Sequence, residues 1–147
     1  MCGIIGITSN KSVSSAIINS LRKLEYRGYD SAGIATLSNG NINEVKSEGR
    51  VDNLEKNLAI KNMQGSVGIG HVRWATHGVP NTINAHPHSS SNVSIVHNGI
   101  IENSTILKKH LISKGHIFKS QTDTEVIVHL ITEYLKENNL KKSIIKM

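Results

Sequence analysis

The chain is poor in several residue types that mark whole classes of protein. Its 147 residues include one cysteine, two prolines, one tryptophan and one phenylalanine. A single cysteine cannot form an intramolecular disulfide framework or a multi-cysteine zinc site. No apolar run approaches the ~20 residues of a membrane-spanning helix, and no basic segment precedes the short apolar start, as it would in a secretory signal. We therefore expect one soluble, reduced, cytoplasmic domain over residues 1–147, without a membrane partner.

The charge of the chain is basic but dispersed. Seventeen Lys and Arg residues against eleven Asp and Glu residues give a formal net charge of +6. The lysines are scattered from Lys11 to Lys146. Because aromatic side chains are few, the sequence offers no stacking platform for nucleotide bases. Scattered lysines are typical of a solvated surface, so we expect no nucleic-acid partner.

The hydrophobic pattern mixes strands and helices without strict alternation, which predicts a layered α+β fold. Asn39-Gly40 between two apolar runs predicts a hairpin turn. Strands are expected over residues 2–8, 33–38, 42–47, 66–76, 93–97 and 116–119. Helices are expected over 12–25 with Ser12 as cap, from Asp52 as cap, from Asn103 to a stop at Gly115, and over 124–138. The last residues, 140–147, are typical of a helix that stops after one or two turns, which indicates a truncated chain.

Cys2 is the sharpest single feature. A lone free cysteine is most often a small buried hydrophobe. This one directly follows the initiator Met1, whose removal a small second residue permits, and it would then carry both a thiol and a free α-amine. An α-amine titrates at about 7.7–8.0, so it can exchange protons with a neighbouring nucleophile near neutral pH. Position alone makes Cys2 a candidate nucleophile.

Histidines crowd the middle of the chain. His86 and His88 have the spacing of a metal-ligand pair, but no Asp or Glu occurs between Glu55 and Glu102. A histidine ligand usually needs a carboxylate or carbonyl behind it. We therefore favour hydrogen bonding in a loop or core over metal binding, and expect neither a metal nor another cofactor.

Three further features allow two interpretations each. Asn98-Gly99 predicts either a type I′ hairpin turn or an oxyanion hole built from a side-chain amide and a backbone N–H. Asp123, just before a helix, is either an N-cap or a ligand for a substrate ammonium. Arg27 and Arg73 stand in a chain that otherwise prefers lysine, so each forms either a planar fork for a carboxylate or a structural ion pair.

Six strings in this order and spacing resemble the class II glutamine amidotransferases, a family that hydrolyses glutamine with an N-terminal cysteine. The resemblance implies an N-terminal-nucleophile αββα sandwich, here incomplete at its C-terminus. Each string is weak alone, and the specificity lies in the set. The strings are MCGIIGI at 1–7, EYRGYDSAGIA at 25–35, GHVRWATHGVPN at 70–81, NAHPH at 84–88, VHNGIIEN at 96–103 and TDTEV at 122–126.

The resemblance also implies a role for each matching residue. Cys2, after loss of Met1, would be the nucleophile and its α-amine the acid and base. Asn98 and Gly99 would form the oxyanion hole. For the substrate L-glutamine, the resemblance implies that Arg73 binds the α-carboxylate and Asp123 binds the α-ammonium. Arg27 and Gly28 would lie beside the nucleophile, and His86 would shape the pocket. The loop that closes over the substrate would consist of Trp74, Ala75, Thr76, His77 and Gly78.

Within the class, the second, third and fifth strings are similar to the branch that aminates fructose 6-phosphate to glucosamine 6-phosphate. That branch carries two sugar-isomerase domains after the glutaminase domain, and the resemblance implies that fructose 6-phosphate is reached only through them, in a homodimer of the full-length protein. Two alternatives stay open. The chain is either the glutaminase half of another class II amidotransferase, or a small basic binding module in which Cys2 has no chemical role.

Overall fold

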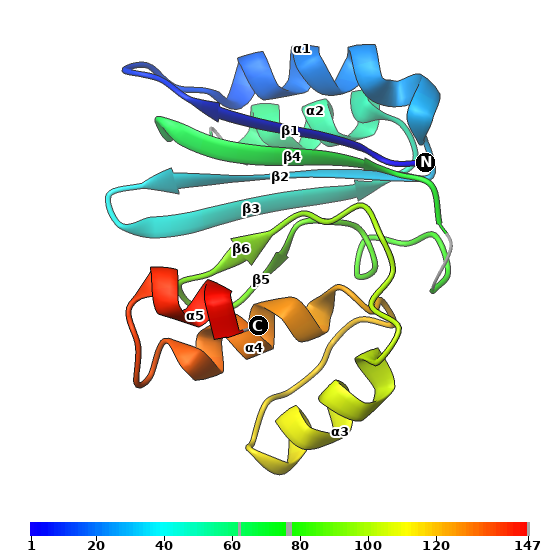
Figure 1. Ribbon diagram of the computed structural model, residues 1–147. Coiled ribbons are helices and arrows are strands. Elements are labelled where there is room, and N and C mark those ends of the chain that lie inside the picture. The colour runs from blue at the N-terminus through cyan, green and yellow to red at the C-terminus, as the bar shows by residue number, and fades with distance from the viewer. Residues whose placement is uncertain (62, 76–77, 147) are drawn as a thin grey trace.

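The computed structural model describes residues 1–61, 63–75 and 78–146 and stacks them in layers (Figure 1). Helices α1 (Ser14–Leu24) and α2 (Val51–Lys61) cover one face of a four-stranded sheet. A small two-stranded sheet and three more helices lie beyond the other face. This α+β layering confirms the expected fold class.

The main sheet is antiparallel throughout, in the order β1-β4-β2-β3. Its strands are β1 (Gly3–Thr8), β2 (Ser31–Ser38), β3 (Asn41–Glu48) and β4 (Val67–Arg73). Asn39 and Gly40 join β2 to β3 with φ angles of 51° and 78°. Positive φ at both central residues is what a type I′ turn requires, so the predicted hairpin is confirmed.

Strand β4 presents different residues to its two faces. A Cβ placed on Gly70 would lie 2.5 Å from Cγ2 of Ile17, so α1 lies directly on the glycine face of this strand. Side chains alternate along a strand, and therefore His71 and Arg73 project from the opposite face. Both side chains are buried there, between the main sheet and the second layer.

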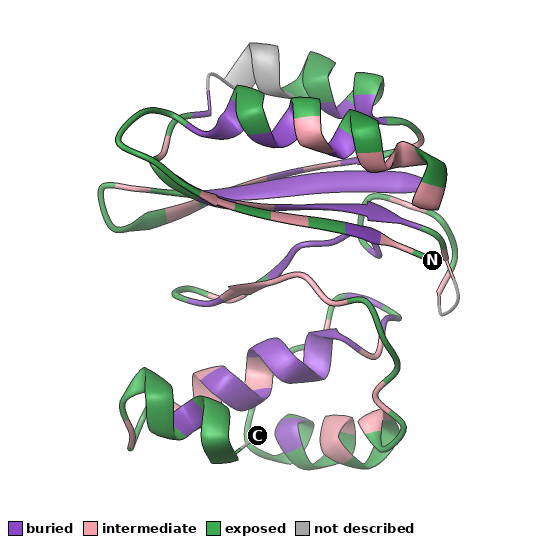
Figure 2. Cartoon of the chain, turned by 45° about the horizontal axis from the view of Figure 1, so that its top comes forward, coloured by how far each residue is buried: buried purple, intermediate pink, exposed green. Residues whose placement is uncertain are grey.

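The second layer holds two short strands, β5 (His88–Ser89) and β6 (Ser94–Ile95), and helices α3 (Ser104–Ser113), α4 (Glu125–Tyr134) and α5 (Leu140–Lys146). Its apolar core is separate from the one under α1 and α2. In Figure 2, buried residues colour the main sheet and the side of α1 that faces it, and a second group of buried residues runs along α4. No described helix is long and apolar enough to cross a bilayer.

The predicted helix starts were wrong in two places, because distant segments provide the partners. Helix α1 has Val13, not Ser12, at its N-cap, where the Val13 N–H donates to the Gly65 carbonyl over 2.9 Å. Asp52 lies inside α2 and does not cap it. The first N–H of α2, on Val51, donates instead to Oε1 of Glu25 over 2.8 Å. Glu25 begins η1 (Glu25–Arg27), the short 3-10 helix that follows α1.

Two predictions near the C-terminal end were also wrong. Residues 116–119 pair with no strand in the part of the chain that the structure describes. The N–H groups of Lys119 and Ser120 donate to the Glu125 carboxylate instead, over 2.8 and 2.7 Å, so this segment serves the N-terminus of α4. Helix α4 ends at Tyr134, four residues before the expected end. The expected helix at the end of the chain is present as α5.

Candidate active site

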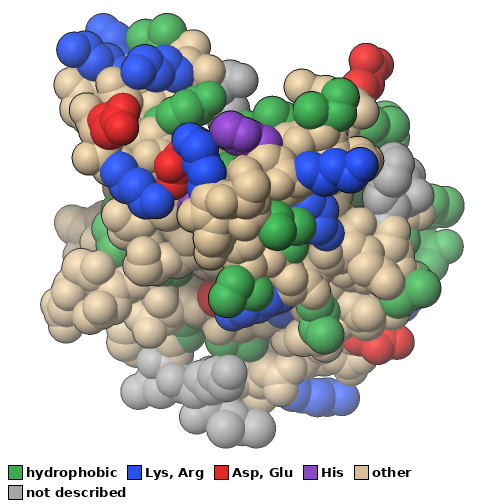
Figure 3. All heavy atoms as spheres, turned by 90° about the horizontal axis from the view of Figure 1, so that it is seen from below, with side chains coloured by type: hydrophobic (Ala, Val, Ile, Leu, Met, Phe, Trp, Pro, Cys, Tyr) green, Lys and Arg blue, Asp and Glu red, His purple; other side chains and the backbone are tan. Residues whose placement is uncertain are grey.

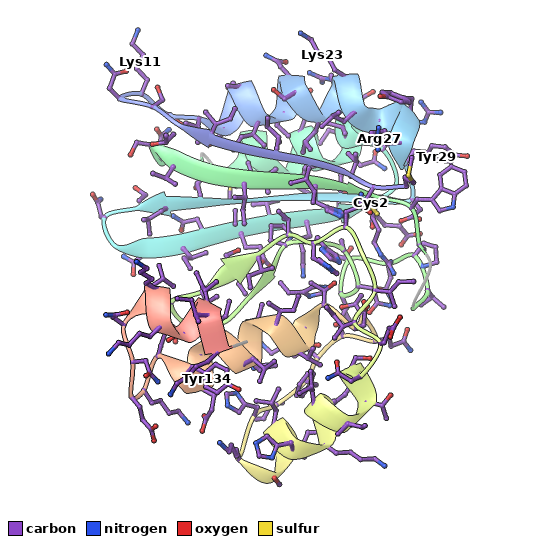
Figure 4. The ribbon with its side chains drawn as sticks, in the orientation of Figure 1. Cys2, Lys11, Lys23, Arg27, Tyr29 and Tyr134 are labelled. Atoms are coloured by element: carbon purple, nitrogen blue, oxygen red, sulfur yellow. The ribbon has the colours of Figure 1, made fainter. Side chains whose placement is uncertain are left out.

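Cys2 lies where the N-terminus meets the end of β4. Gly3 pairs with Val72 in the ladder between β1 and β4, which brings Cys2 beside Arg73 and Trp74. The Trp74 N–H donates to Sγ of Cys2 over 3.4 Å, and the thiol lies 3.8 Å from the Trp74 carbonyl oxygen. Figure 4 shows Cys2 at this end of the sheet with Arg27 and Tyr29 close by. Two main-chain groups thus fix the thiol at the sheet edge.

The backbone of Cys2 is held from two other segments. Nε of Arg27, at the end of η1, donates to the Cys2 carbonyl oxygen over 3.1 Å. Nδ2 of Asn98, in the segment after β6, donates to the same oxygen over 3.4 Å. Arg27 and Asn98 therefore both meet the residue that the sequence marks as nucleophile, although they lie 71 positions apart.

A cavity of about 260 Å³ opens beside the thiol. It is smaller than the 300–1,000 Å³ typical of sites for drug-sized ligands, so its volume suits a small metabolite. The cavity is lined by charged, thiol and amide groups together with a few apolar side chains. The wall is formed by Met1, Cys2, Arg73, Trp74, His86, His97, Asn98, Gly99, Ile100, Thr122, Asp123 and Thr124.

Opposite charges from distant parts of the chain meet in this wall. Arg73 is 4% exposed, and its guanidinium donates to the carbonyl oxygens of Gly78 and Val79 over 3.2 and 3.4 Å. The Asp123 carboxylate accepts the N–H of Ile101 over 2.6 Å. The N-cap interpretation of Asp123 was wrong, because Thr124 occupies the N-cap of α4. A cation and an anion in one small cavity match a zwitterionic ligand.

The side-chain amides of buried Asn84 and exposed Gln121 hold the loop that accepts from Arg73. Nδ2 of Asn84 donates to the Val79 carbonyl over 2.9 Å and to Oε1 of Gln121 over 3.0 Å. The N–H of Gln121 returns a bond of 2.8 Å to Oδ1 of Asn84. Gly78 has a φ of 77°, which favours glycine at this point of the loop. This amide pair fixes the carbonyl groups that orient Arg73.

Gly28 and Asp30 support the same end of β4. A Cβ on Gly28 would lie 2.5 Å from the Arg73 carbonyl carbon and 2.7 Å from the Trp74 nitrogen. The N–H of Asp30 donates to the Arg73 carbonyl over 3.2 Å, and its carboxylate accepts a short hydrogen bond from the Ala75 N–H. Sequence reasoning assigned no role to Asp30. The signal was its place inside the string EYRGYDSAGIA, between Arg27 and the start of β2.

The turn interpretation of Asn98-Gly99 was wrong. Among the described residues, neither Asn98 nor Gly99 has the positive φ of a type I′ turn, and β6 pairs with β5 rather than with a strand after Gly99. Instead both residues line the cavity. Asn98 and Gly99 therefore belong to the cavity wall rather than to a hairpin turn.

The histidine pair with metal-ligand spacing is engaged in ring contacts and hydrogen bonds. The ring centroids of His86 and His88 are 4.7 Å apart at 63°, and Nε2 of His88 lies 2.8 Å from Oγ1 of Thr122. Burial lowers the pKa of His88 to about 4 and pushes the pKa of His86 lower still. Across the described ranges, no group of three or more His, Cys, Asp and Glu side chains has an arrangement that could hold a metal ion.

The remaining predicted site residues divide between exposed and undescribed positions. Trp74 is 48% exposed and meets the Tyr29 ring edge-on, with centroids 5.6 Å apart. Thr76 and His77 lie outside the described residues. Away from the cavity, the basic side chains on the face seen in Figure 3 stand in separate groups, with acidic side chains among the largest of them. This face shows no continuous basic stripe.

Comparison with known proteins supports the interpretation of the cavity. Residues 57–142, more than half of the chain, match the family model described as "Glutamine amidotransferase domain". The chain is 54% identical over 148 residues to a glutamine–fructose-6-phosphate aminotransferase (isomerizing) of Clostridium acetobutylicum, covering 99% of this chain and 24% of that protein. It is 57% identical over 136 residues to the protein of the same name from Bartonella quintana, covering 92% of this chain and 22% of that one. The chain therefore spans about a quarter or less of the curated relatives it matches.

Among solved structures, the chain is similar to a glutamine phosphoribosylpyrophosphate amidotransferase of B. subtilis complexed with ADP and GMP. The TM-score is 0.81 at 30% sequence identity, over 98% of this chain and 31% of that one. An allosteric regulatory enzyme of purine biosynthesis gives a TM-score of 0.83 at 31% identity, over 98% and 32%. The α+β fold is that of these N-terminal-nucleophile amidotransferases.

Proposed function

The chain belongs to the glutamine amidotransferase domain family, and we propose that it hydrolyses L-glutamine to glutamate and ammonia through Cys2. The observation that carries the proposal is the cavity itself. One small cavity is lined by a thiol at the N-terminus, an Arg, an Asp and a side-chain amide. These are the groups that binding and cleaving the γ-amide of an amino acid would need.

The backbone end of glutamine is a zwitterion, and the cavity offers a partner for each charge. Arg73 would bind the α-carboxylate through its planar guanidinium, and Asp123 would bind the α-ammonium. Trp74, Thr76 and His77 would close over the bound substrate. Holding both charged groups leaves the side-chain amide as the part that can reach Cys2.

Cleavage would then proceed in two steps. The α-amine of Cys2 takes the thiol proton, and sulfur attacks the amide carbon to give a tetrahedral oxyanion bound by Asn98 Nδ2 and the Gly99 N–H. The α-ammonium returns the proton to the leaving nitrogen, ammonia departs, and a γ-glutamyl thioester remains. Water then attacks the thioester, with the α-amine again accepting the proton, and glutamate and the thiol are released.

This chemistry requires removal of Met1. In the chain as written, the nitrogen of Cys2 is an amide and cannot act as a base, and Met1 itself lines the cavity. Removal of Met1 would free the α-amine beside the thiol. A protein that retains Met1 should therefore be almost inactive toward glutamine.

The ammonia acceptor we propose is fructose 6-phosphate, in the protein that contains this chain. Support comes from the curated relatives, which are 54–57% identical and are named glutamine–fructose-6-phosphate aminotransferases. A phosphoribosyl acceptor is the second candidate, because the similar solved structures include a phosphoribosylpyrophosphate amidotransferase. Its lower identity of 30% makes it the weaker choice.

The test is glutamine turnover by the full-length native protein, with its N-terminus checked by mass spectrometry. We expect equal amounts of glutamate and ammonia from the wild type, and none from Cys2→Ala. Supplying fructose 6-phosphate should convert the ammonia into glucosamine 6-phosphate, whereas phosphoribosylpyrophosphate should not consume it. Glutamate production that persists in Cys2→Ala would overturn the proposal.

A further inference from the structure

His97 comes directly before the proposed oxyanion donors, and both polar groups of its main chain are bonded to imidazole rings. The His97 N–H donates to Nδ1 of His86 over 3.3 Å. The His97 carbonyl oxygen lies 3.3 Å from Nε2 of His71. The two rings are stacked, with centroids 4.3 Å apart and planes at 17°. One stacked pair therefore holds the peptide groups on both sides of His97.

The contacts determine the proton positions on both rings. A carbonyl oxygen can only accept, so His71 must carry its proton on Nε2. The main-chain N–H of His97 can only donate, so Nδ1 of His86 must be unprotonated, and the ring proton of His86 must be on Nε2. Burial lowers the pKa of His71 to about 3 and that of His86 further, which keeps both rings neutral. Neutral rings allow the stack and both hydrogen bonds at once.

The main sheet is shaped to admit this pair. Gly33 of β2 lies opposite His71 in the ladder with β4. A Cβ on Gly33 would lie 2.1 Å from the His86 carbonyl oxygen, so a bare glycine is needed for His86 to reach His71. His71 is fully buried and lies outside the cavity wall that the described residues form.

The ring of His97 extends the same network. Its Nδ1 lies 3.1 Å from Oγ1 of Thr124, the N-cap residue of α4 and the neighbour of Asp123. A Cβ on Gly99 would lie 2.7 Å from Nε2 of His97, so Gly99 packs directly on this ring. His97 is thus fixed at its N–H, its carbonyl and its ring, from three separate elements.

We propose that the stacked His71–His86 pair positions the oxyanion donors Asn98 and Gly99 by holding the main chain of His97, with His71 acting as a positioning residue that touches no substrate. The proposal rests on the proposed function. Because His71 acts through Asn98 and Gly99, its loss should lower kcat and leave glutamine binding by Arg73 and Asp123 unchanged.

The variants His71→Gln and His71→Leu separate the hydrogen bond from the packing. The Gln amide places a donor close to the position of imidazole Nε2. The ring nitrogen that is lost, Nδ1 of His71, has no partner within the described chain. Leu fills the site but leaves the His97 carbonyl unpaired. We expect His71→Leu to lower kcat on the order of 100-fold, as a displacement of about 1 Å does, with KM within about twofold of wild type. His71→Gln should recover most of the loss.

Two measurements show that the loss is not simple misfolding. Alkylation of Cys2 by iodoacetamide needs no oxyanion hole, so its rate should stay near the wild-type rate in His71→Leu. Ile34→Ala removes a side chain that is equally buried but belongs to the core under α1 and α2. Assayed well below its melting temperature, this control should keep the wild-type kcat.

A double variant tests the route of the effect. In an Asn98→Ala background, adding His71→Leu should cost less than it costs in the wild type, because one of the two donors that His71 positions is already gone. Losses that multiply in full would overturn the proposal, as would equal activity of His71→Leu and wild type, or a rise in KM that accounts for the whole loss.

The proton positions provide a test that does not depend on activity. Long-range ¹H–¹⁵N spectra of histidine-labelled protein should show His71 and His86 neutral and protonated on Nε2. A proton on Nδ1 of either ring would overturn the proposal even in an active enzyme. If instead the wild type does not hydrolyse glutamine while both rings carry their protons on Nε2, the proposed function is wrong, but the hydrogen bonds of His71 and His86 to the main chain of His97 are confirmed.

Discussion

Gly28 offers a direct test of how closely the site is packed. It lies in extended backbone after η1, against the end of β4 that carries Arg73 and Trp74. In Gly28→Ala the new Cβ would lie 2.5 Å from the Arg73 carbonyl carbon, 2.6 Å from its oxygen and 2.7 Å from the Trp74 nitrogen. All three are main-chain atoms, so no flexible side chain can move aside.

The size of the displacement follows from these distances. Ordinary van der Waals contact begins at 3.4 Å, so the two segments must separate by about 0.9 Å at the closest pair. The Trp74 N–H bonded to Sγ of Cys2 moves with that shift, and so does Arg73. A misplacement of about 1 Å can cost on the order of 100-fold in rate. We therefore expect kcat/KM for glutamine to fall by about that factor, with a loss of about 1–3 kcal/mol in unfolding free energy.

The assay is steady-state glutamine hydrolysis, read as glutamate released, together with the urea midpoint of unfolding. Gly6→Ala is the matched control, because Gly6 lies in β1 of the same sheet and its Cβ would meet nothing within 4 Å. Gly6→Ala should keep the wild-type kcat/KM. Wild-type activity in Gly28→Ala, or an equal loss in both variants, would show that the contact of Gly28 with β4 does not set the geometry of the site.

Three further predictions concern the oxyanion site, the pH dependence of stability and the core. Asn98→Ala should lower kcat on the order of 10²–10³-fold with little change in KM, measured by the same hydrolysis assay. Burial alone would raise the pKa of Glu125. The His129 ring, whose Nε2 lies 3.5 Å from Oε1, and hydrogen bonds from Lys119 and Ser120 lower that pKa to about 2. Its folded pKa lies below the ordinary value of 4.5, so this stabilisation is complete above pH 4.5 and is lost as pH falls toward 2. Glu125→Gln should therefore be less stable than wild type at pH 7, with the difference in urea midpoint shrinking below pH 4.5. Ile17→Ala, at a fully buried position, should cost about 2–5 kcal/mol in urea unfolding.

Each of these has a result that would contradict it. An Asn98→Ala loss confined to KM would indicate substrate binding rather than stabilisation of the oxyanion. A stability difference between Glu125→Gln and wild type that is constant from pH 7 to pH 2 would show that the carboxylate is not selectively stabilised in the folded state. An Ile17→Ala midpoint equal to that of wild type would mean that α1 contributes little to the core.

Local sequence patterns predicted the elements whose partners are near in the chain. The hairpin at Asn39-Gly40 depends on two residues that tolerate positive φ, and its strands follow directly. Gly115, with a φ of 90°, follows α3 as predicted. In such cases the residues that decide the structure are adjacent, so a pattern of a few residues contains the information.

Most of the errors fell where groups far along the chain decide the structure, and one fell where a nearby side chain does. Helix α2 starts at Val51 because Glu25, 26 positions earlier, accepts its first N–H. Residues 116–119 have the pattern of a strand, but the Glu125 carboxylate takes up the N–H groups of Lys119 and Ser120. Likewise Asp123 bonds to Ile101 rather than capping its own helix. The partners of Val51 and Asp123 lie 26 and 22 positions away, outside any local window, whereas Glu125 follows Lys119 by six positions and is recognised only from the fold.

The candidate site shows the same division. Cys2 and Arg73 stood out from the sequence because the type of residue is unusual at its position. The supporting residues did not, since Asn84 and Gln121 are ordinary polar residues until the fold joins their amides. The His71–His86 stack also needs the close approach of the His86 backbone to β2, which Gly33 permits. The sequence pattern does not show that these two segments meet.

If Cys2 is the nucleophile, it forms a thioester with the γ-carbonyl of glutamine, and this intermediate can be captured. The full-length protein is mixed with glutamine, quenched in acid within milliseconds, digested and examined by mass spectrometry. We expect one γ-glutamyl group on Cys2, on a peptide that lacks Met1, and we expect hydroxylamine to remove this group. Glutamate released without an adduct on Cys2, or an adduct on another residue, would contradict the role of Cys2 as nucleophile.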